Sequence, residues 1–318
     1  MRLSEQELPR VEVIIPTLNS MKNLGQCLEG ILKQDYRGEI KITVIDGGST
    51  DGTVEFVKKL SVNLISRPGL YMNGIGGAYD IAIKQSTSEL IWRIDSDNII
   101  IERNALENLI EPFLRDGLVN ISIPEPEIDK DSNYFNRYLS WKDIQHIEEV
   151  KRKYGKFNGN YYTVDEMPYG LTNASIVKRG IYLEVGGFDS DVRVLDRLRE
   201  KGLARCAIVP AVHFYHYQVT SPFDYRKKQL KRVMLFQKMS SDQLENFYVK
   251  ISSPSRKYDK RMVRAISLSI EDFRFIFRKD VWYDKNMKWA AITNILVTMS
   301  IILFHPLASV RMFKKHFT

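Results

Sequence analysis

The first hundred residues alternate between short apolar runs and segments with helical features, and this alternation limits the fold most strongly. Apolar runs of strand length occupy residues 11–15, 40–45, 62–65 and 90–94. Helices are expected between them, at residues 23–34, 53–60 and 77–85. Strands joined by single helices form right-handed crossovers and parallel neighbours. The sequence therefore predicts an α/β fold with a mainly parallel sheet flanked by helices.

Three of these predicted strands are followed directly by polar residues. The clusters are Thr17-Leu-Asn19, Asp46-Gly-Gly-Ser-Thr-Asp51 and Asp95-Ser-Asp97. In open parallel sheets, ligands bind beyond the carboxyl ends of the strands. We therefore expect the three clusters to line one ligand site.

The carboxylates in these clusters suit a divalent cation. Asp95 and Asp97 are two residues apart at a strand end, where both can face one cavity and offer oxygen ligands to Mg²⁺ or Mn²⁺. A nucleotide diphosphate would supply further oxygens. Asp46 precedes Gly47 and Gly48, which permit close approach of the backbone to a ligand. Asp51 is expected to have a structural role as a helix cap.

The cysteine content and the amino-terminal residues bear on the compartment. Cys27 and Cys206 are too few for a disulfide framework or a four-thiolate zinc site, so we expect both to be buried in a reducing compartment. The first residues are polar and charged, without the apolar core of a signal peptide. The catalytic part is therefore expected in the cytoplasm.

The rear of the chain differs from the front in charge. Residues 221–288 carry 17 Lys/Arg against 8 Asp/Glu, with interleaved aromatic residues, and predict basic amphipathic helices at an anionic lipid surface. Residues 289–310 carry no formal charge and would span roughly 33 Å as a helix, enough to cross a bilayer. A core helix and a re-entrant turn at Pro306 are the alternatives to a membrane-spanning helix.

The polar and aromatic residues of segment 120–185 predict a loop-rich cap over the site.

This pattern divides the chain into three expected parts. Residues 1–220 would form the α/β domain that carries the ligand site. Residues 221–288 would form the interfacial helices, and residues 289–318 a membrane segment with a basic tail.

Five motifs in order resemble the family 2 glycosyltransferases, whose nucleotide-binding domain has the GT-A fold. They are Val13-Ile-Ile-Pro-Thr-Leu-Asn19, Val44-Ile-Asp-Gly-Gly-Ser-Thr-Asp-Gly-Thr53, Gly74-Ile-Gly-Gly-Ala-Tyr-Asp80, Ile94-Asp-Ser-Asp97 and Glu184-Val-Gly-Gly-Phe-Asp189. The resemblance covers about residues 11–235 and is closest to membrane-associated members.

The resemblance implies a role for each matching position. Pro16, Thr17 and Asn19 would line the base and ribose pocket, with Gly76 also on the nucleotide side. Asp46 would bind the uracil or guanine edge. Asp95 would reach the ribose or the metal, Asp97 would ligate the metal, and His216 would lie near the metal and diphosphate. Arg226 or Arg232 could neutralise the leaving diphosphate, although most basic residues of this segment are expected to face the membrane surface.

The catalytic base is where the chain departs from the family pattern. The acidic pair that usually follows Gly-Gly-Phe is shortened here. Asp191 aligns best with the base when Arg197-Leu198 is matched to the family's Arg-Leu, and Asp189 and Asp196 are rivals. Leu18 replaces a common aromatic residue, and Asp80 stands where Asn is usual.

The predicted function is an inverting transfer of a sugar from a nucleotide diphosphate donor, most simply a UDP-sugar, with Mg²⁺ or Mn²⁺. The acceptor would be lipid-linked or a growing glycan at the cytoplasmic face of the cell membrane. Alternatives are an inactive or weak membrane scaffold on the same fold and a polyprenyl-phosphate sugar synthase. A dinucleotide-dependent oxidoreductase is disfavoured because the first strand lacks G-x-G-x-x-G after it. Nucleic-acid binding is not expected, because the carboxylate cluster would repel phosphates without a metal.

Overall fold

The computed structural model describes residues 8–70, 76–167, 173–189, 191–221, 224–225, 288–289, 291–293 and 295–296. Contacts divide the chain into two compact units. One contains residues 1–128 and 140–217, and the other contains residues 129–139 and 218–318. Residues 134–139, the start of helix α5 (Tyr134–Tyr154), belong to the second unit, and all the strands and other helices named below belong to the first.

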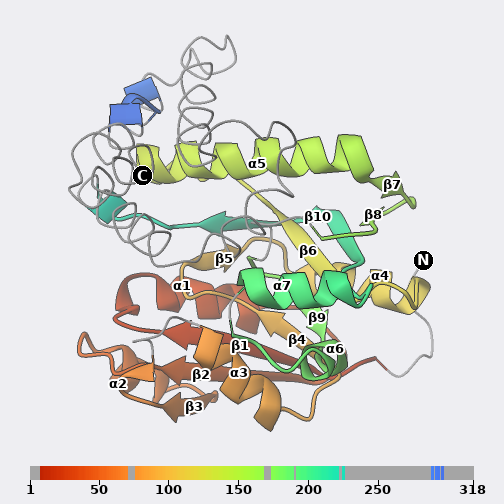
Figure 1. The fold of residues 1–318 in the computed structure, drawn as a ribbon. Helices are drawn as coiled ribbons and strands as arrows, with labels where there is room; N and C mark the ends of the chain where they lie inside the picture. The colour runs from red at the N-terminus through yellow and green to blue at the C-terminus, as the bar shows by residue number, and fades with distance from the viewer. Residues whose placement is uncertain are drawn as a thin grey trace, which may run out of the picture. The chain divides into compact units, whose positions relative to one another are not determined.

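A single sheet of ten strands forms the centre of the first unit (Figure 1). The strands are β1 (Val11–Thr17), β2 (Ile40–Asp46), β3 (Asn63–Ser66), β4 (Leu90–Arg93), β5 (Asn98–Ile100), β6 (Ile121–Pro126), β7 (Lys156–Phe157), β8 (Tyr162–Val164), β9 (Ile176–Lys178) and β10 (Cys206–His216). The helices are α1 (Met21–Leu32), α2 (Thr53–Val57), α3 (Gly76–Gln85), α4 (Ala105–Arg115), α5 (Tyr134–Tyr154), α6 (Arg179–Glu184) and α7 (Asp191–Glu200).

The strand order is β3-β2-β1-β4-β9-β6-β10-β8-β7, with β5 paired to β10. The four strands β3-β2-β1-β4 are parallel, as the alternating sequence predicts. The rest of the sheet is mixed, because β9 enters between β4 and β6 and runs antiparallel to both. The prediction of a mainly parallel sheet therefore holds for the front of the chain and is wrong for the sheet as a whole.

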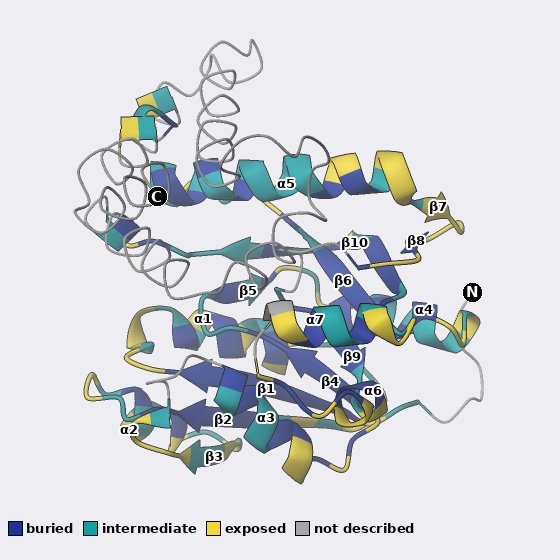
Figure 2. Ribbon diagram, viewed as in Figure 1, coloured by how far each residue is buried: buried dark blue, intermediate teal, exposed yellow. Residues whose placement is uncertain are grey.

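Helices cover both faces of the sheet (Figure 2). On one face, α1 and α4 pack against the side chains of Val13, Ile15 and Trp92. On the other face, α3, α6 and α7 pack against those of Ile14, Ile45 and Ile91. Because side chains in a strand alternate in direction, the fully buried strand β1 contributes side chains to both cores.

Residues 120–185 contain β6, β7, β8, β9, α6 and the 21-residue helix α5. The expectation of a loop-rich cap is therefore wrong. The sequence pattern does not predict helix α5, because most of its positions are charged or polar. Its buried apolar side chains include Phe135 and Tyr138 near the start and Ile147 and Val150 near the end.

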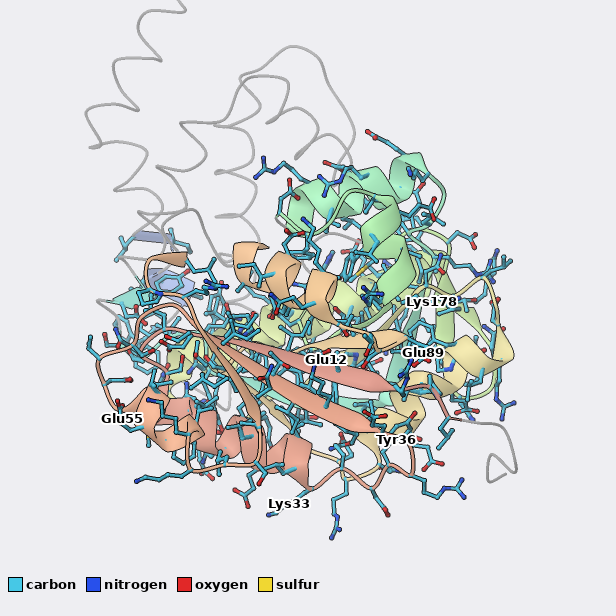
Figure 3. The ribbon with its side chains drawn as sticks, turned by 90° about the horizontal axis from the view of Figure 1, so that it is seen from below. Glu12, Lys33, Tyr36, Glu55, Glu89 and Lys178 are labelled. Atoms are coloured by element: carbon cyan, nitrogen blue, oxygen red, sulfur yellow. The ribbon has the colours of Figure 1, made fainter. Side chains whose placement is uncertain are left out.

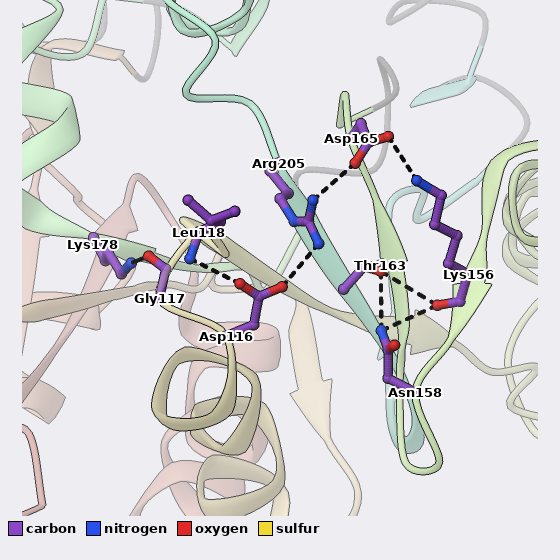
Figure 4. Close-up of polar contacts among 9 residues, drawn as sticks. All are labelled: Asp116, Gly117, Leu118, Lys156, Asn158, Thr163, Asp165, Lys178 and Arg205. Atoms are coloured by element: carbon purple, nitrogen blue, oxygen red, sulfur yellow. Dashed lines mark hydrogen bonds and ion pairs between the residues drawn. The ribbon is translucent and has the colours of Figure 1, made fainter.

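Two groups of polar contacts hold the amino ends of the strands. The hydroxyl of Tyr36 donates to the carbonyl of Pro9 at 2.6 Å, and Glu89 accepts from the backbone N–H of Arg10 at 2.8 Å, so both fix the entry into β1 (Figure 3). The guanidinium of Arg205 bridges Asp116 at 2.9 Å and Asp165 at 3.0 Å (Figure 4). The polar clusters lie at the opposite edge of the sheet, at or just beyond the carboxyl ends of β1, β2 and β4.

No helix among the described residues is long and apolar enough to cross a membrane. Most of the segments predicted as basic helices and membrane segment, 226–287 and 297–318, lie outside the described residues.

Candidate active site

The first two polar clusters meet at the carboxyl ends of β1 and β2, where Thr17 is the register partner of Asp46. The carboxylate of Asp46 is fully buried. Its Oδ1 accepts from the backbone N–H groups of Gly48 at 2.8 Å and Ser49 at 2.9 Å. Its Oδ2 accepts from the hydroxyls of Thr17, at 3.1 Å, and Ser49. Asp46 therefore shapes the loop after β2 and fixes it to the end of β1.

Asn19 joins the same two loops from the other side. Its backbone has a φ of 53°, in the left-handed region that Asn tolerates better than most residues. Its N–H donates to the hydroxyl of Ser49 at 2.8 Å, and its side-chain oxygen accepts from the N–H of Thr50 at 2.9 Å. Pro16 is buried within β1, next to Thr17.

Asp51 has a structural role, as predicted, but it precedes Gly52, which is the N-cap residue of α2. Its carboxylate accepts from the N–H of Met21, the first residue of α1, at 3.0 Å and from the N–H of Thr53, the first residue of α2, at 3.1 Å. Burial would raise the pKa of Asp51, but the hydrogen bonds from Thr53 and Met21 outweigh it and lower that pKa.

Each residue of the third cluster, Asp95-Ser96-Asp97, forms a hydrogen bond with a different part of the chain. The hydroxyl of Tyr79 on α3 donates to Oδ1 of Asp95 at 2.7 Å. The hydroxyl of Ser96 donates at 2.8 Å to that of Ser20, which precedes α1. The carbonyl of Asp97 accepts from the N–H of Tyr217, just after β10, at 2.9 Å. The triplet is thus anchored on three sides.

His216 lies beside this triplet. It is the last residue of β10 and the register partner of Asn98 on β5. Its Nε2 is 3.6 Å from Oδ1 of Asp97, and its Nδ1 is 3.4 Å from the amide nitrogen of Asn173. The side chain of His216 is 11% exposed and that of Asp97 is 30% exposed, so a ligand can reach the carboxylate.

Asp95, Asp97 and His216 are not assembled into a three-ligand metal site. Within the described part of the chain, no group of three or more His, Cys, Asp or Glu side chains is placed to hold a metal ion. The structure brings Asp97 and His216 together, while Asp95 accepts from Tyr79. A carboxylate and an imidazole still form a suitable donor pair for Mn²⁺ when substrate phosphates supply the other oxygens.

Cys27 lies behind the triplet. Its thiol donates to the carbonyl of Asp95 at 3.7 Å. Burial raises the pKa of this thiol, and the carboxylates of Asp97 and Asp95 raise it further. Burial also raises the pKa of Cys206 to about 12. Both cysteines are buried, as predicted.

The motifs around Gly76 and Phe188 pack directly against each other. A Cβ added at Gly76 would lie 1.9 Å from the carbonyl oxygen of Asp189. The side chain of Asp80 accepts from the N–H of Phe188 at 3.0 Å and pairs with Lys84 at 2.7 Å. Gly76, predicted on the nucleotide side, is therefore needed to let α3 approach the loop before α7.

The three candidate bases lie on or just before α7. Oδ1 and Oδ2 of Asp189 accept from the guanidinium of Arg197 at 3.0 and 3.2 Å, and Arg193 is 3.1 Å away. Asp189 is thereby bound in an ion-pair cluster. Asp196 is half-buried on α7. Asp191 is the first residue of α7, and its side chain lies outside the described part, as do Arg226 and Arg232.

Two side chains of the site were missed by sequence reasoning: Tyr79 and Ser20. Tyr79 belongs to the motif Gly74–Asp80, and its spacing to the buried positions Ala82 and Ile83 would have placed it on the inner side of α3. Ser20 precedes a predicted helix, but its contact with Ser96 depends on the tertiary fold.

Comparison with known families settles the class of protein. The model of glycosyl transferase family 2 matches residues 12–184, more than half of the chain. The chain belongs to glycosyl transferase family 2. The predicted family is confirmed, whereas the resemblance to its membrane-associated members stays a prediction. Thr17, Asp46, Gly76, Asp95 and Asp97 all fall inside the matched region.

Two curated relatives illustrate the range of similarity within family 2. The Streptococcus pneumoniae glycosyltransferase GlyG is 28% identical over 186 residues, which cover 55% of this chain and 58% of the relative. The Staphylococcus aureus poly(ribitol-phosphate) β-N-acetylglucosaminyltransferase TarS is 35% identical over 95 residues, covering 29% of this chain and 17% of TarS. The chain thus matches only part of the length of these relatives.

Solved structures agree on the fold. A Pyrobaculum calidifontis mannosyltransferase in complex with GDP-Man and Mn²⁺ aligns with a TM-score of 0.52 at 20% identity, covering 97% of this chain and 80% of the other. S. aureus TarS 1–349 in complex with UDP aligns with a TM-score of 0.50 at 15% identity, covering 97% and 93%. The fold is therefore GT-A-like, with a mixed sheet flanked by helices.

Proposed function

We propose that this protein transfers a sugar from a nucleotide diphosphate donor, a UDP-sugar, to an acceptor hydroxyl with inversion at the anomeric carbon. The proposal is supported by the positions of Asp46, Asp95 and Asp97 at or just after the carboxyl ends of β2 and β4, the two strands that pair in parallel with β1. Carboxyl ends of parallel strands are where α/β folds bind nucleotides.

The donor would lie along this edge with its base toward the loops after β1 and β2. Hydrogen bonds among Thr17, Asn19, Asp46 and Ser49 join these two loops, so we expect less ordering to be needed when a ligand binds. UDP is favoured by the TarS complex, while the mannosyltransferase complex contains GDP-Man. Both nucleotides therefore belong in a test.

Asp97 and His216 would hold a divalent cation, Mg²⁺ or Mn²⁺, together with the donor's phosphate oxygens. Such a cation stabilises negative charge on the leaving diphosphate. Asp95, oriented by Tyr79, would contact the ribose or the cation.

The transfer itself needs a base on the acceptor side. The acceptor oxygen bonds to the anomeric carbon, the bond from that carbon to the diphosphate oxygen breaks, and the acceptor proton passes to a carboxylate. Asp191 is proposed for this role, because Asp189 is held by Arg193 and Arg197. A carboxylate serves as base only within hydrogen-bond reach of the hydroxyl.

The acceptor is proposed to be lipid-linked or a growing glycan at the cytoplasmic face of the cell membrane. This part of the proposal is supported by sequence alone. Residues 221–288 carry the positive excess that an anionic surface attracts, and residues 289–310 are uncharged. The same features fit a polyprenyl-phosphate sugar synthase, in which the acceptor is the lipid phosphate itself.

A panel of UDP- and GDP-sugars with MnCl₂ tests the proposal. Thermal stabilisation is measured first, since a ligand at 100 times its dissociation constant adds about 2.7 kcal/mol. Release of the nucleoside diphosphate is measured next, with and without lipid phosphate and glycan acceptors. The proposal expects stabilisation by one nucleotide sugar and its turnover. Stabilisation without turnover under any acceptor would indicate an inactive scaffold, and no stabilisation by any member would refute nucleotide-sugar binding.

A further inference from the structure

The hydroxyl of Tyr79 forms a hydrogen bond with the Asp95 carboxylate. The phenol oxygen lies 2.7 Å from Oδ1 of Asp95, a short hydrogen bond to a charged group. Tyr79 is 1% exposed, so its hydroxyl donates from within the core of the first unit rather than from solvent.

The ring of Tyr79 is fixed by its neighbours. The guanidinium of Arg93 lies 4.5 Å from the centre of the Tyr79 ring and 4.2 Å from that of Phe188. The rings of Tyr79 and Phe188 also meet edge to face at 5.3 Å. A cation on an aromatic face and an edge-to-face pair each favour one ring orientation.

This packing connects the two sides of the site. Arg93 belongs to β4 and precedes Asp95 by two residues, while Phe188 belongs to the loop before α7. Tyr79 lies on α3 and reaches Asp95 over Arg93. A carboxylate attached at Cβ and held at Oδ1 has little freedom to rotate, so the direction of its second oxygen is set as well.

We propose that Tyr79 is a positioning residue that orients the carboxylate of Asp95 toward the nucleotide-sugar donor. The proposal rests on the proposed function, because it assigns Asp95 a contact with the donor. A purely structural role for Tyr79, as a core aromatic ring, is the competing explanation. The two explanations differ in the role of the Tyr79 hydroxyl. If Tyr79 is a positioning residue, loss of its hydrogen bond to Asp95 weakens donor binding. If Tyr79 is only a core aromatic ring, loss of the hydroxyl does not affect donor binding.

Tyr182 offers a matched control. It is also buried, at 2% exposed, and its ring packs on Phe188 at 5.4 Å. Its hydroxyl accepts from Arg93 Nη1 at 3.5 Å. Removal of either hydroxyl leaves the aromatic packing in place, but the hydroxyl of Tyr79 is bonded to Asp95 and that of Tyr182 to Arg93.

The experiment compares the unchanged protein with Tyr79→Phe and Tyr182→Phe. Calorimetry gives the dissociation constants for UDP and GDP in MnCl₂, and the kinetics of the nucleotide sugar that the unchanged protein turns over give KM and kcat. We expect Tyr79→Phe to weaken nucleotide binding and raise the donor KM by about tenfold, the size of one lost hydrogen bond to a charged group. The variant should keep kcat within about threefold, and Tyr182→Phe should match the unchanged protein in both constants.

Equal nucleotide affinities for the two variants would overturn the role of Tyr79 and leave nucleotide binding by the unchanged protein intact. A drop in melting temperature for Tyr79→Phe without any change in donor KM would also overturn it, because that is the signature of a packing role. Absence of nucleotide binding by the unchanged protein would refute the proposed function and this inference together.

Discussion

Nε2 of His216 lies 3.6 Å from Oδ1 of Asp97, which brings the end of β10 to the loop after β4. The two residues come from distant parts of the sequence and meet because β5, which follows Asp97 directly, pairs antiparallel with the end of β10. A pair of this kind, with a partly exposed carboxylate, can bind a cation that a diphosphate completes. The parallel strands β2-β1-β4 place the remaining polar clusters at the same edge of the sheet.

The contact between α3 and the loop before α7 predicts a strong effect of a single methyl group. Gly76→Ala would place Cβ 1.9 Å from the carbonyl oxygen of Asp189, and the backbone would have to move. We expect a loss of about 1–3 kcal/mol in the free energy of unfolding, measured by urea denaturation. Gly180→Ala on α6 is the control, because its added Cβ meets nothing within 4 Å and alanine favours a helix. Equal stability of the two variants would contradict this packing.

Asp51 makes folding stability depend on pH in the acid range. The lowered pKa of its folded-state carboxyl means that its contribution is present above the pKa of the unfolded chain and is lost as pH falls through the folded pKa. Asp51→Asn should therefore be less stable than the unchanged protein at pH 7, by less than about 1 kcal/mol because the carboxylate is exposed. The difference should shrink at pH values below the ordinary pKa of aspartate, when followed by urea denaturation at several pH values. A difference that does not change with pH would exclude this role.

The two neighbouring aspartates near α7 should behave differently. Asp191→Asn is expected to reduce sugar transfer by about 10²–10⁴-fold, the usual effect of removing a general base, while nucleotide affinity is unchanged. Asp189→Asn should keep turnover within about threefold, because an exposed ion pair with Arg193 and Arg197 contributes little. Steady-state kinetics of both variants, with the nucleotide affinity measured in parallel, decide between them. Loss of turnover in Asp189→Asn alone would assign the base to Asp189 instead.

The sequence predicts the parallel half of the fold because each strand and helix there has a clear period and a clear end. The run 11–15 became β1, and the polar residues after it reached the expected edge. The second half of the chain has no such alternation of strands and helices. Strand β9 follows the segment that contains α5, β7 and β8, and it inserts between β4 and β6. The order of these strands depends on pairing between segments that are far apart in the sequence. The periodicity of hydrophobic residues along one segment does not predict which other segment it pairs with.

The candidate site divides in the same way. Asp46, Asp95 and Asp97 could be placed because a strand end fixes their location. The partners that orient them could not, because Tyr79 reaches Asp95 from another helix and Ser20 reaches Ser96 across the edge of the sheet. The ion pairs of Asp189 with Arg193 and Arg197 also could not be predicted from the family pattern, because they depend on the geometry of the loop before α7.

The most direct test of the account is the turnover of the selected nucleotide sugar by Asp97→Asn at increasing MnCl₂ concentrations. Asp165→Asn serves as the control, because Asp165 is an exposed acid that pairs with Arg205 beyond the other end of β10. The account predicts a loss of about 10²-fold or more for Asp97→Asn, which added Mn²⁺ does not restore, and near-normal turnover for Asp165→Asn. Near-normal turnover by Asp97→Asn would contradict the assignment of the cation and diphosphate to this edge of the sheet.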